Sequence, residues 1–104
     1  MTDKLWQPSE ERIANANLTR FMQSLGFSDY GDLYRWSIDH PEEFWEKVWT
    51  FGEVKASQTW DHVLVDKDKM PGAKWFTGAK LNFAENLLRF RDDKIAIIFN
   101  RAVW

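Results

Sequence analysis

A run of apolar, β-prone residues near the C-terminal end, residues 95–99 (Ile-Ala-Ile-Ile-Phe), limits the folds that this chain can adopt. A continuous apolar run of this kind is typical of a strand that is covered on both faces. The sequence contains no second run of comparable quality, and a strand without a neighbour leaves its backbone groups unpaired. We therefore expect the sequence to stop within a sheet whose other strands it does not contain.

The aromatic content leads to a similar expectation. The 104 residues include 7 Trp, 8 Phe and 2 Tyr, which amounts to 16% of the chain. Each buried aromatic side chain covers roughly 150–250 Å², whereas one domain of this size buries only about 60–65% of the surface of its unfolded chain. We therefore expect either an exposed aromatic patch or packing against a body that the sequence does not include.

Apolar spacing predicts a mainly α fold with one or two short strands. The first helix covers residues 10–25, with Ser9 as its cap and Gly26 as its stop. The second covers residues 29–37, and the third begins at Pro41 and ends before Gly52. Their apolar faces consist of Ala14, Leu18, Phe21, Met22 and Leu25, of Tyr30, Leu33, Tyr34 and Trp36, and of Phe44, Trp45, Val48 and Trp49.

A short fourth helix is expected after a capping box in which Asn82 is the cap and Glu85 the third helical residue. It runs to about residue 90 and is predicted to bury Phe83, Leu87 and Leu88. Before it, residues 53–81 show no sustained period, apart from a short extended piece at 60–65 and a turn at 70–72. Such a long irregular segment is uncommon in a small compact domain, so we expect it to follow the surface of a larger body.

The glycine-bounded segment Gly72–Lys80 is the nearest approach to a phosphate-binding loop. A Walker A loop has four residues between its glycines and then Lys followed by Ser or Thr. Here five residues intervene, Ala79 separates Gly78 from Lys80, and Leu81 follows. We interpret the segment as two tight turns around a buried Trp75–Phe76 pair.

The other polar candidates are weak as well. His40 precedes a proline at a helix start, and His62 lies beside Asp61 with no nucleophile placed near it by a motif. Two isolated histidines make a poor metal site, residues 66–69 lack the glycine and the terminal Glu of a calcium loop, and the adjacent carboxylates at 42–43 and 92–93 diverge. We assign no catalytic, cofactor-binding or metal-binding residue.

The overall charge also excludes some classes of partner. The formal net charge is −2 and the pI about 5.6, which gives no charge-based case for nucleic acid or an anionic membrane. There is no Cys, so disulfide scaffolds, thiolate metal sites and cysteine nucleophiles are excluded. We find neither an apolar run of membrane-spanning length nor the apolar core of a secretion signal, so a cytoplasmic chain is expected.

Two stretches are diagnostic of a family: residues 34–45, YRWSIDHPEEFW, and residues 70–88, MPGAKWFTGAKLNFAENLL. Together they resemble the N-terminal region of acyl-CoA synthetases of the acetyl-CoA and acetoacetyl-CoA type, which are adenylate-forming ligases. The opening LWQPS at residues 5–9 and the form GAKLNFAEN are similar to the acetoacetyl-CoA branch. Ala79, Phe83 and Lys74 depart from the Gly, Tyr and Arg common in this family without weakening the match.

The resemblance implies an α/β ligase of which this chain is the N-terminal extension, incomplete as a stand-alone fold. Residues 1–90 would be the helical N-terminal domain, and residues 91–104 the first strand of the large AMP-binding domain. Family members activate acetoacetate with Mg-ATP to form an acyl-adenylate and pyrophosphate, then transfer the acyl group to coenzyme A. The resemblance places the sites for ATP, Mg and coenzyme A downstream of this chain, so no site residue is carried over.

Two functional hypotheses follow. In the first, the chain is the structural N-terminal portion of an acetoacetate–CoA ligase, inactive by itself. Its partner is then the large domain, and its anchors are Trp36, Phe44, Trp45, Trp49, Trp75 and Phe76. In the second, it is a free-standing helical interaction module derived from the ligase N-terminus. Self-association through exposed aromatics is a further expectation. A third possibility, a small nucleotide-binding enzyme, rests only on the glycine-bounded segment that fails to match a Walker A loop.

Overall fold

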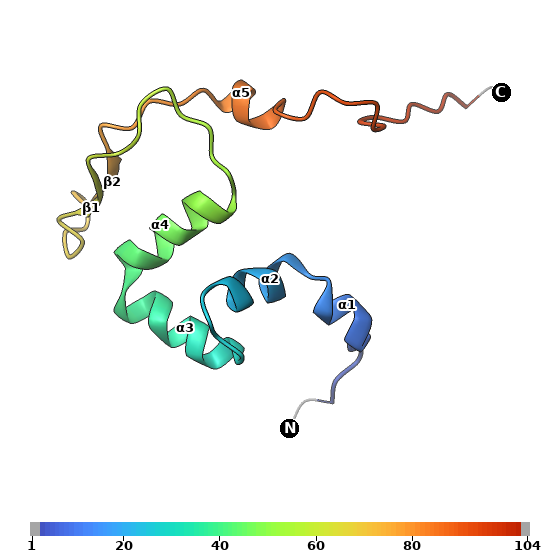
Figure 1. Ribbon diagram of the computed structural model, residues 1–104, viewed down its shortest axis with the longest axis horizontal. Coiled ribbons are helices and arrows are strands. Elements are labelled where there is room, and N and C mark those ends of the chain that lie inside the picture. Colours follow the sequence, from blue (N-terminus) through green and yellow to red (C-terminus); the bar gives the residue numbers. More distant parts are fainter. Residues whose placement is uncertain (1–2, 103–104) are drawn as a thin grey trace.

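The computed structural model describes residues 3–102, and in them a helical region is followed by a β-hairpin, a short helix and an extended arm (Figure 1). The elements of this part are α1 (Glu10–Ala14), α2 (Asn17–Ser24), α3 (Tyr30–Asp39), α4 (Pro41–Phe51), β1 (His62–Val65), β2 (Lys74–Thr77) and α5 (Phe83–Leu87). The expected fold class, mainly α with one or two short strands, is confirmed.

The helix predicted over residues 10–25 is two helices. Ser9 caps α1 as expected, because its side chain accepts a hydrogen bond from the Arg12 amide at 3.2 Å. The chain then becomes extended at Ala16 and restarts at Asn17. At this break the Arg20 guanidinium donates to the Asn15 carbonyl at 3.1 Å and to Asn17 Oδ1 at 2.9 Å, so a side chain satisfies a carbonyl that the interrupted helix leaves free.

The predicted stop at Gly26 is confirmed. Gly26 has a φ of 79°, its amide donates to the Gln23 carbonyl at 3.1 Å, and the Phe27 amide donates to the Met22 carbonyl at 2.9 Å. This pair of bonds is a Schellman motif, which satisfies the last carbonyls of α2. Farther along, α4 begins at Pro41 and is capped by Gly52, again as expected.

The segment at residues 53–81, expected to be largely irregular, contains an antiparallel hairpin. Strand β1 pairs with β2 in the register His62↔Thr77, Leu64↔Trp75 and Val65↔Lys74. The extended piece expected at 60–65 corresponds to β1, whereas β2 was not predicted. Four-residue strands are too short to show a clear period, so the pairing across the hairpin, rather than the local sequence, defines β2.

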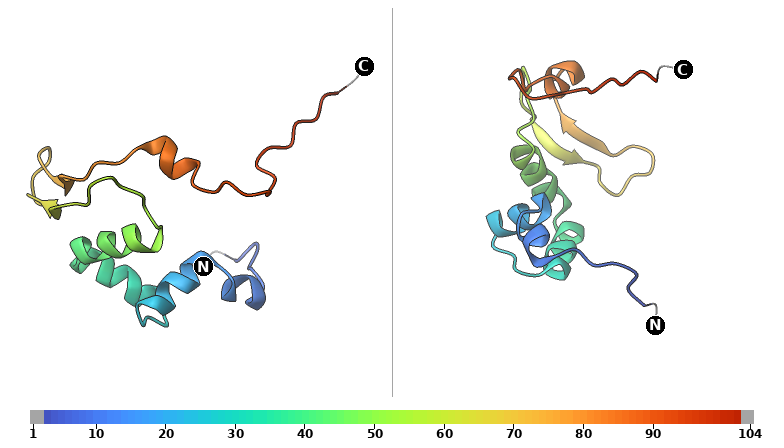
Figure 2. Two further views of the ribbon diagram at one scale, coloured as in Figure 1. Left: turned by 45° about the horizontal axis from the view of Figure 1, so that its top comes forward. Right: turned by 90° about the vertical axis from the view of Figure 1, so that its right-hand side faces the viewer.

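The molecule is open rather than compact (Figure 2). Its radius of gyration is 18.9 Å, compared with about 13 Å for a compact domain of this length. Its accessible surface is 9734 Å², compared with about 6,100 Å² for a folded monomer of this mass. In the described residues, the buried apolar side chains are Phe21, Leu33 and Leu64. About 3,600 Å² of surface is therefore exposed that a compact domain of this size would cover.

The arm formed by residues 89–102 differs from two expectations. Residues 95–99 form no strand, because no neighbouring strand within residues 3–102 lies beside them to accept or donate hydrogen bonds. The predicted burial of Phe83, Leu87 and Leu88 is also wrong, since each is at least 60% exposed. Residues 1–2 of the expected 1–90 domain and residues 103–104 of the expected 91–104 segment lie outside the described residues.

Candidate functional site

Helix α4 organises the packing, and one of its faces meets α2 and α3. The ring of Phe21 on α2 lies 6.0 Å from that of Phe44 and 5.2 Å from that of Phe51, both in edge-on geometry. Trp36 of α3 lies 6.1 Å from Phe44. Edge-on aromatic pairs at these distances are favourable beyond the area that they bury. These contacts hold the three helices in the arc seen in Figure 1.

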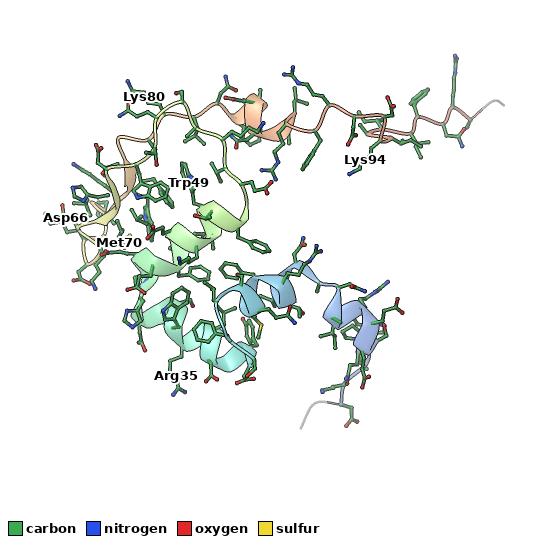
Figure 3. All side chains as sticks on the ribbon, viewed as in Figure 1. Arg35, Trp49, Asp66, Met70, Lys80 and Lys94 are labelled. Atoms are coloured by element: carbon green, nitrogen blue, oxygen red, sulfur yellow. The ribbon has the colours of Figure 1, made fainter. Side chains whose placement is uncertain are left out.

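The other face of α4 carries tryptophans toward the hairpin. Trp49 lies 5.0 Å from Trp60 and 4.9 Å from Phe76 between ring centroids, and Trp60 lies 5.7 Å from Phe76. Figure 3 shows Trp49 on the side of α4 that faces the β-strand region. One turn earlier, Trp45 contacts Trp75 of β2 at 5.9 Å. This aromatic packing attaches the hairpin to the helical region.

The structure therefore gives a partner within the chain to each expected anchor. Trp36, Phe44, Trp49 and Phe76 are half-buried by other side chains of this chain, whereas Trp45 and Trp75 remain 41% and 48% exposed. The six anchors were expected to pack against a body outside the chain. That packing stays a prediction, and within the described residues the same anchors hold α3, α4 and the hairpin together.

An apolar groove of about 380 Å³ lies among α2, α3 and α4. Among the residues that line it, Phe21 and Leu33 are buried, whereas Leu18, Tyr30 and Tyr34 are exposed. The two tyrosine rings stack with centroids 6.3 Å apart. The residues that line it are Asn17, Leu18, Phe21, Tyr30, Leu33, Tyr34, Ser37, Phe44, Val48 and Phe51. We call this feature the helical groove.

A polar clasp attaches α5 to the segment that follows α4. The Asn86 side chain accepts a hydrogen bond from the Lys55 amide at 2.7 Å and donates to the Lys55 and Asn82 carbonyls, each at 2.9 Å. Arg89 Nη1 donates to the carbonyls of Gly52 and Glu53 at 2.6 and 3.0 Å. A cation at these carbonyls also suits the negative end of the α4 dipole.

The clasp was not predicted, because nothing in the local pattern distinguishes Asn86 or Arg89 from solvated polar residues. The cap of α5 was predicted correctly: Asn82 Oδ1 accepts from the Glu85 amide at 3.1 Å. A capping signal lies within four residues of sequence. The clasp, in contrast, joins residues that are separated by 31 and by 37 positions.

Beyond the clasp, the arm displays apolar side chains to solvent. Exposed patches this extensive are rare on monomeric proteins and mark interaction surfaces. The large apolar residues of α5, of the neighbouring positions 81 and 88, and of the arm are all at least half exposed: Leu81, Phe83, Leu87, Leu88, Phe90, Ile95, Ile97, Ile98 and Phe99. The helical groove and this apolar arm together form the candidate docking surface.

The residues weighed for chemistry are scattered. The backbone of Lys74–Thr77, inside the glycine-bounded segment, pairs with β1 rather than forming a phosphate cradle, and Trp75 is less buried than expected. His40 lies between α3 and α4 with its Nδ1 3.9 Å from Glu43, while His62 is exposed on β1. Asp66 and Met70 lie at the far end of the hairpin (Figure 3). Within residues 3–102 no three metal-ligating side chains converge.

Three comparisons with known proteins show what this chain is similar to. Residues 30–87 match the family described as "Acetyl-coenzyme A synthetase N-terminus". An acetoacetyl-CoA synthetase of Danio rerio is 37% identical over 99 residues, covering 89% of this chain and 15% of that protein. A malonamoyl-CoA synthetase of Penicillium aethiopicum is 36% identical over 105 residues, covering 90% of this chain and 14% of that protein.

A solved structure agrees with the sequence matches. The chain is similar to acetoacetyl-CoA synthetase from Streptomyces lividans with a TM-score of 0.72 and 41% identity, over 81% of this chain and 14% of that one. The chain thus spans about 15% of the length of the curated relatives it matches. In the described residues, no helix combines the length and the apolar character needed to cross a membrane.

Proposed function

The chain belongs to the acetyl-coenzyme A synthetase N-terminus family, and from this premise we propose that it is the N-terminal docking portion of an acetoacetate–CoA ligase. In this role the helical groove and the apolar arm pack against the large domain of the ligase. The chain contributes structure to the enzyme and catalyses nothing by itself.

The observation that carries the proposal is the exposed surface. A chain of this length that exposes about 3,600 Å² more surface than a compact monomer needs a partner, because leaving the apolar part of that surface in water forfeits the main driving force of folding. Obligate interfaces bury 2,000–5,000 Å² in total, counting both partners. One large body that covers both the helical groove and the arm would supply an interface of this class.

The reaction proposed for the whole ligase converts ATP, acetoacetate and coenzyme A to AMP, diphosphate and acetoacetyl-CoA. The residues described here do not fit the nucleotide or its magnesium ion, because the backbone of the glycine-bounded segment is paired in β2 and the acidic side chains do not converge. We therefore assign ATP, Mg and coenzyme A to the large domain and no step of the reaction to residues 3–102. A cytoplasmic location belongs to the same proposal.

The test uses the acetoacetyl-CoA synthetase of Streptomyces lividans with its matching N-terminal segment removed. The present chain is added in trans, and acetoacetate-dependent pyrophosphate release is measured together with binding by sedimentation. We expect no turnover from the chain alone, binding to the truncated ligase, and partial recovery of its activity. Turnover by the chain alone, or no binding at all, contradicts the proposal.

The alternative is a free-standing helical interaction module, and the helical groove is the observation that favours it. A module selected to fold alone should unfold in one sharp, cooperative transition as a monomer. The ligase proposal instead predicts a broad, weakly cooperative transition, because residues 3–102 enclose so small a core. Calorimetry of a dilute sample distinguishes the two.

A further inference from the structure

The ends of α2 and α4 are closed by the same hydrogen-bond motif, but they differ in the residue at its left-handed position. At the end of α2 this residue is Gly26, with a φ of 79°. At the end of α4 it is Glu53, with a φ of 52°, although Gly52 directly before it has an ordinary φ of −75°. Left-handed backbone is unfavourable for a residue with a Cβ atom. The end of α4 therefore carries a conformational cost that the end of α2 avoids.

The motif at the end of α4 forms despite this cost. The Glu53 amide donates to the Thr50 carbonyl at 3.1 Å. The Val54 amide donates to the Trp49 carbonyl at 3.2 Å, which completes a Schellman motif. A strained residue of this kind persists only where the surrounding structure holds it in place. A contact that favours the left-handed conformation of Glu53 is therefore expected nearby.

Arg89 supplies such a contact. Its Nη1 atom donates to the Gly52 carbonyl at 2.6 Å and to the Glu53 carbonyl at 3.0 Å. These carbonyls belong to the two planar peptide groups on either side of the Glu53 Cα atom, so the φ and ψ of Glu53 fix their relative orientation. A single nitrogen that bonds both carbonyls favours the conformation that brings them together, which here is the left-handed one.

We propose that Arg89 holds the left-handed turn at Glu53, and that these two positioning residues set the direction in which the chain leaves α4. The segment that follows the turn leads to the hairpin and back to α5, from which the apolar arm extends (Figure 1). The Asn86 side chain binds both the amide and the carbonyl of Lys55, two residues after the turn. The turn thus determines where α5 and the arm lie relative to the helical groove.

The consequence for docking rests on the ligase proposal. The helical groove precedes the turn in the chain and the apolar arm follows it, so the two parts reach one body together only when the turn has the right conformation. A turn that is already formed avoids the cost of ordering it during binding. The two parts then bind as linked sites rather than independently. Arg89 and Glu53 would act on docking through this geometry.

Amide hydrogen exchange tests the hold of Arg89 on the turn. The Val54 amide reports the turn, because it bonds to Trp49 and not to Arg89. Arg89→Ala should accelerate its exchange about fivefold. Adding Glu53→Gly removes the strain and should restore exchange at Val54 to within twofold of the unmodified chain. Arg91→Ala is the control, because it removes the same charge from an exposed side chain nearby, and it should change nothing.

The split between Val54 and α5 separates this role from simple attachment of the helix. The Leu88 amide of α5 should stay accelerated in the double variant, because the bonds from Arg89 to the end of α4 are still missing. An arginine that only attaches α5 would leave exchange at Val54 unchanged. No acceleration at Val54 in Arg89→Ala, or no recovery there on adding Glu53→Gly, overturns the proposal.

Binding to the truncated Streptomyces lividans synthetase tests the docking role, with Arg89 left in place. Glu53→Gly permits the left-handed turn, whereas Glu53→Pro forbids it, because the proline ring fixes φ near −65°. By sedimentation, Glu53→Gly should bind within threefold of the unmodified chain and Glu53→Pro at least tenfold more weakly. If Glu53→Pro loses helicity at 222 nm, Arg89→Ala takes its place in this comparison, with Arg91→Ala as its control.

The outcomes distinguish this inference from the ligase proposal. If the unmodified chain binds the truncated synthetase and the two Glu53 variants bind equally well, the docking role of the turn is wrong and the ligase proposal stands. If the unmodified chain does not bind, the ligase proposal fails and the docking role fails with it. The exchange rates at Val54 decide in either case whether Arg89 holds the turn.

Discussion

Replacing Asn86 by Ala should release α5 from the rest of the molecule. The substitution removes three hydrogen bonds, one accepted from the Lys55 amide and two donated to the Lys55 and Asn82 carbonyls. Each is worth about 0.5–1 kcal/mol at a half-exposed site. Ala recovers about 0.5 kcal/mol because it is the better helix former. The net loss in the free energy of opening is therefore about 1–2.5 kcal/mol.

Asn86→Asp separates the two halves of the clasp. The carboxylate keeps an acceptor for the Lys55 amide, but it places a second oxygen where the Nδ2 group donates to two carbonyls. Repulsion between oxygens adds to the two lost bonds. We therefore expect Asn86→Asp to destabilise the clasp at least as much as Asn86→Ala does, although it is nearly identical in shape.

Amide hydrogen exchange measures the effect residue by residue. The Lys55 amide loses its acceptor in the Ala variant, so its faster exchange is a direct consequence. The Leu88 amide is the informative probe, because it donates to the Ala84 carbonyl at 2.9 Å and not to Asn86. A loss of 1–2.5 kcal/mol corresponds to exchange about 5–70 times faster at Leu88.

Asn100→Ala provides the matched control, since Asn100 is exposed on the arm. It should leave exchange at Lys55 and Leu88 unchanged. If exchange at Leu88 changes less than twofold in both Asn86 variants, the clasp does not hold α5, and the argument from its hydrogen bonds is wrong.

Three further substitutions, the first with a matched control, have measurable outcomes. Gly78→Ala should destabilise the hairpin by about 2 kcal/mol in urea titrations followed by tryptophan fluorescence, because Gly78 has a φ of 78° and an added Cβ would overlap the Asp61 carboxylate. Gly26→Ala is its control, with a similar φ of 79° but open space around the Cβ, and should cost about 1 kcal/mol. Phe21→Ala empties the centre of the helical packing and should cost about 3 kcal/mol, seen as lost helicity at 222 nm; retention of full helicity would contradict the assigned core. Arg89→Ala should cost about 1 kcal/mol by removing two hydrogen bonds to carbonyls, and unchanged amide exchange in α5 would refute that role.

The elements that the sequence predicts well are those with local signals. The caps at Ser9 and Asn82, the stop at Gly26 and the start at Pro41 each depend on residues within one helical turn. The family also follows from the sequence, because two long motifs carry the resemblance and residues 30–87 match the family. The aromatic surplus correctly indicated a chain that does not enclose its own apolar surface.

The candidate docking surface is harder to predict from the sequence. The stripe on α3 and α4 identifies apolar faces, but it does not say which residues contact one another and which stay free. The six expected anchors found partners inside the chain, while Phe83, Leu87 and Leu88, expected to be buried, are exposed. Burial depends on which elements meet in space. Two residues that are neighbours on one helix can therefore differ completely in the exposed fractions of their side chains.

By itself, then, the sequence determined the helices, their caps, the family and the excess of apolar surface, because these depend on composition and on interactions within a few residues. Only the tertiary structure decided the pairing of β2 with β1 and the clasp that joins Asn86 to Lys55. It also decided that residues 95–99 form no strand in this chain. The pairing of β2 and the clasp join residues far apart in sequence, and a strand exists only where a second backbone supplies its hydrogen bonds.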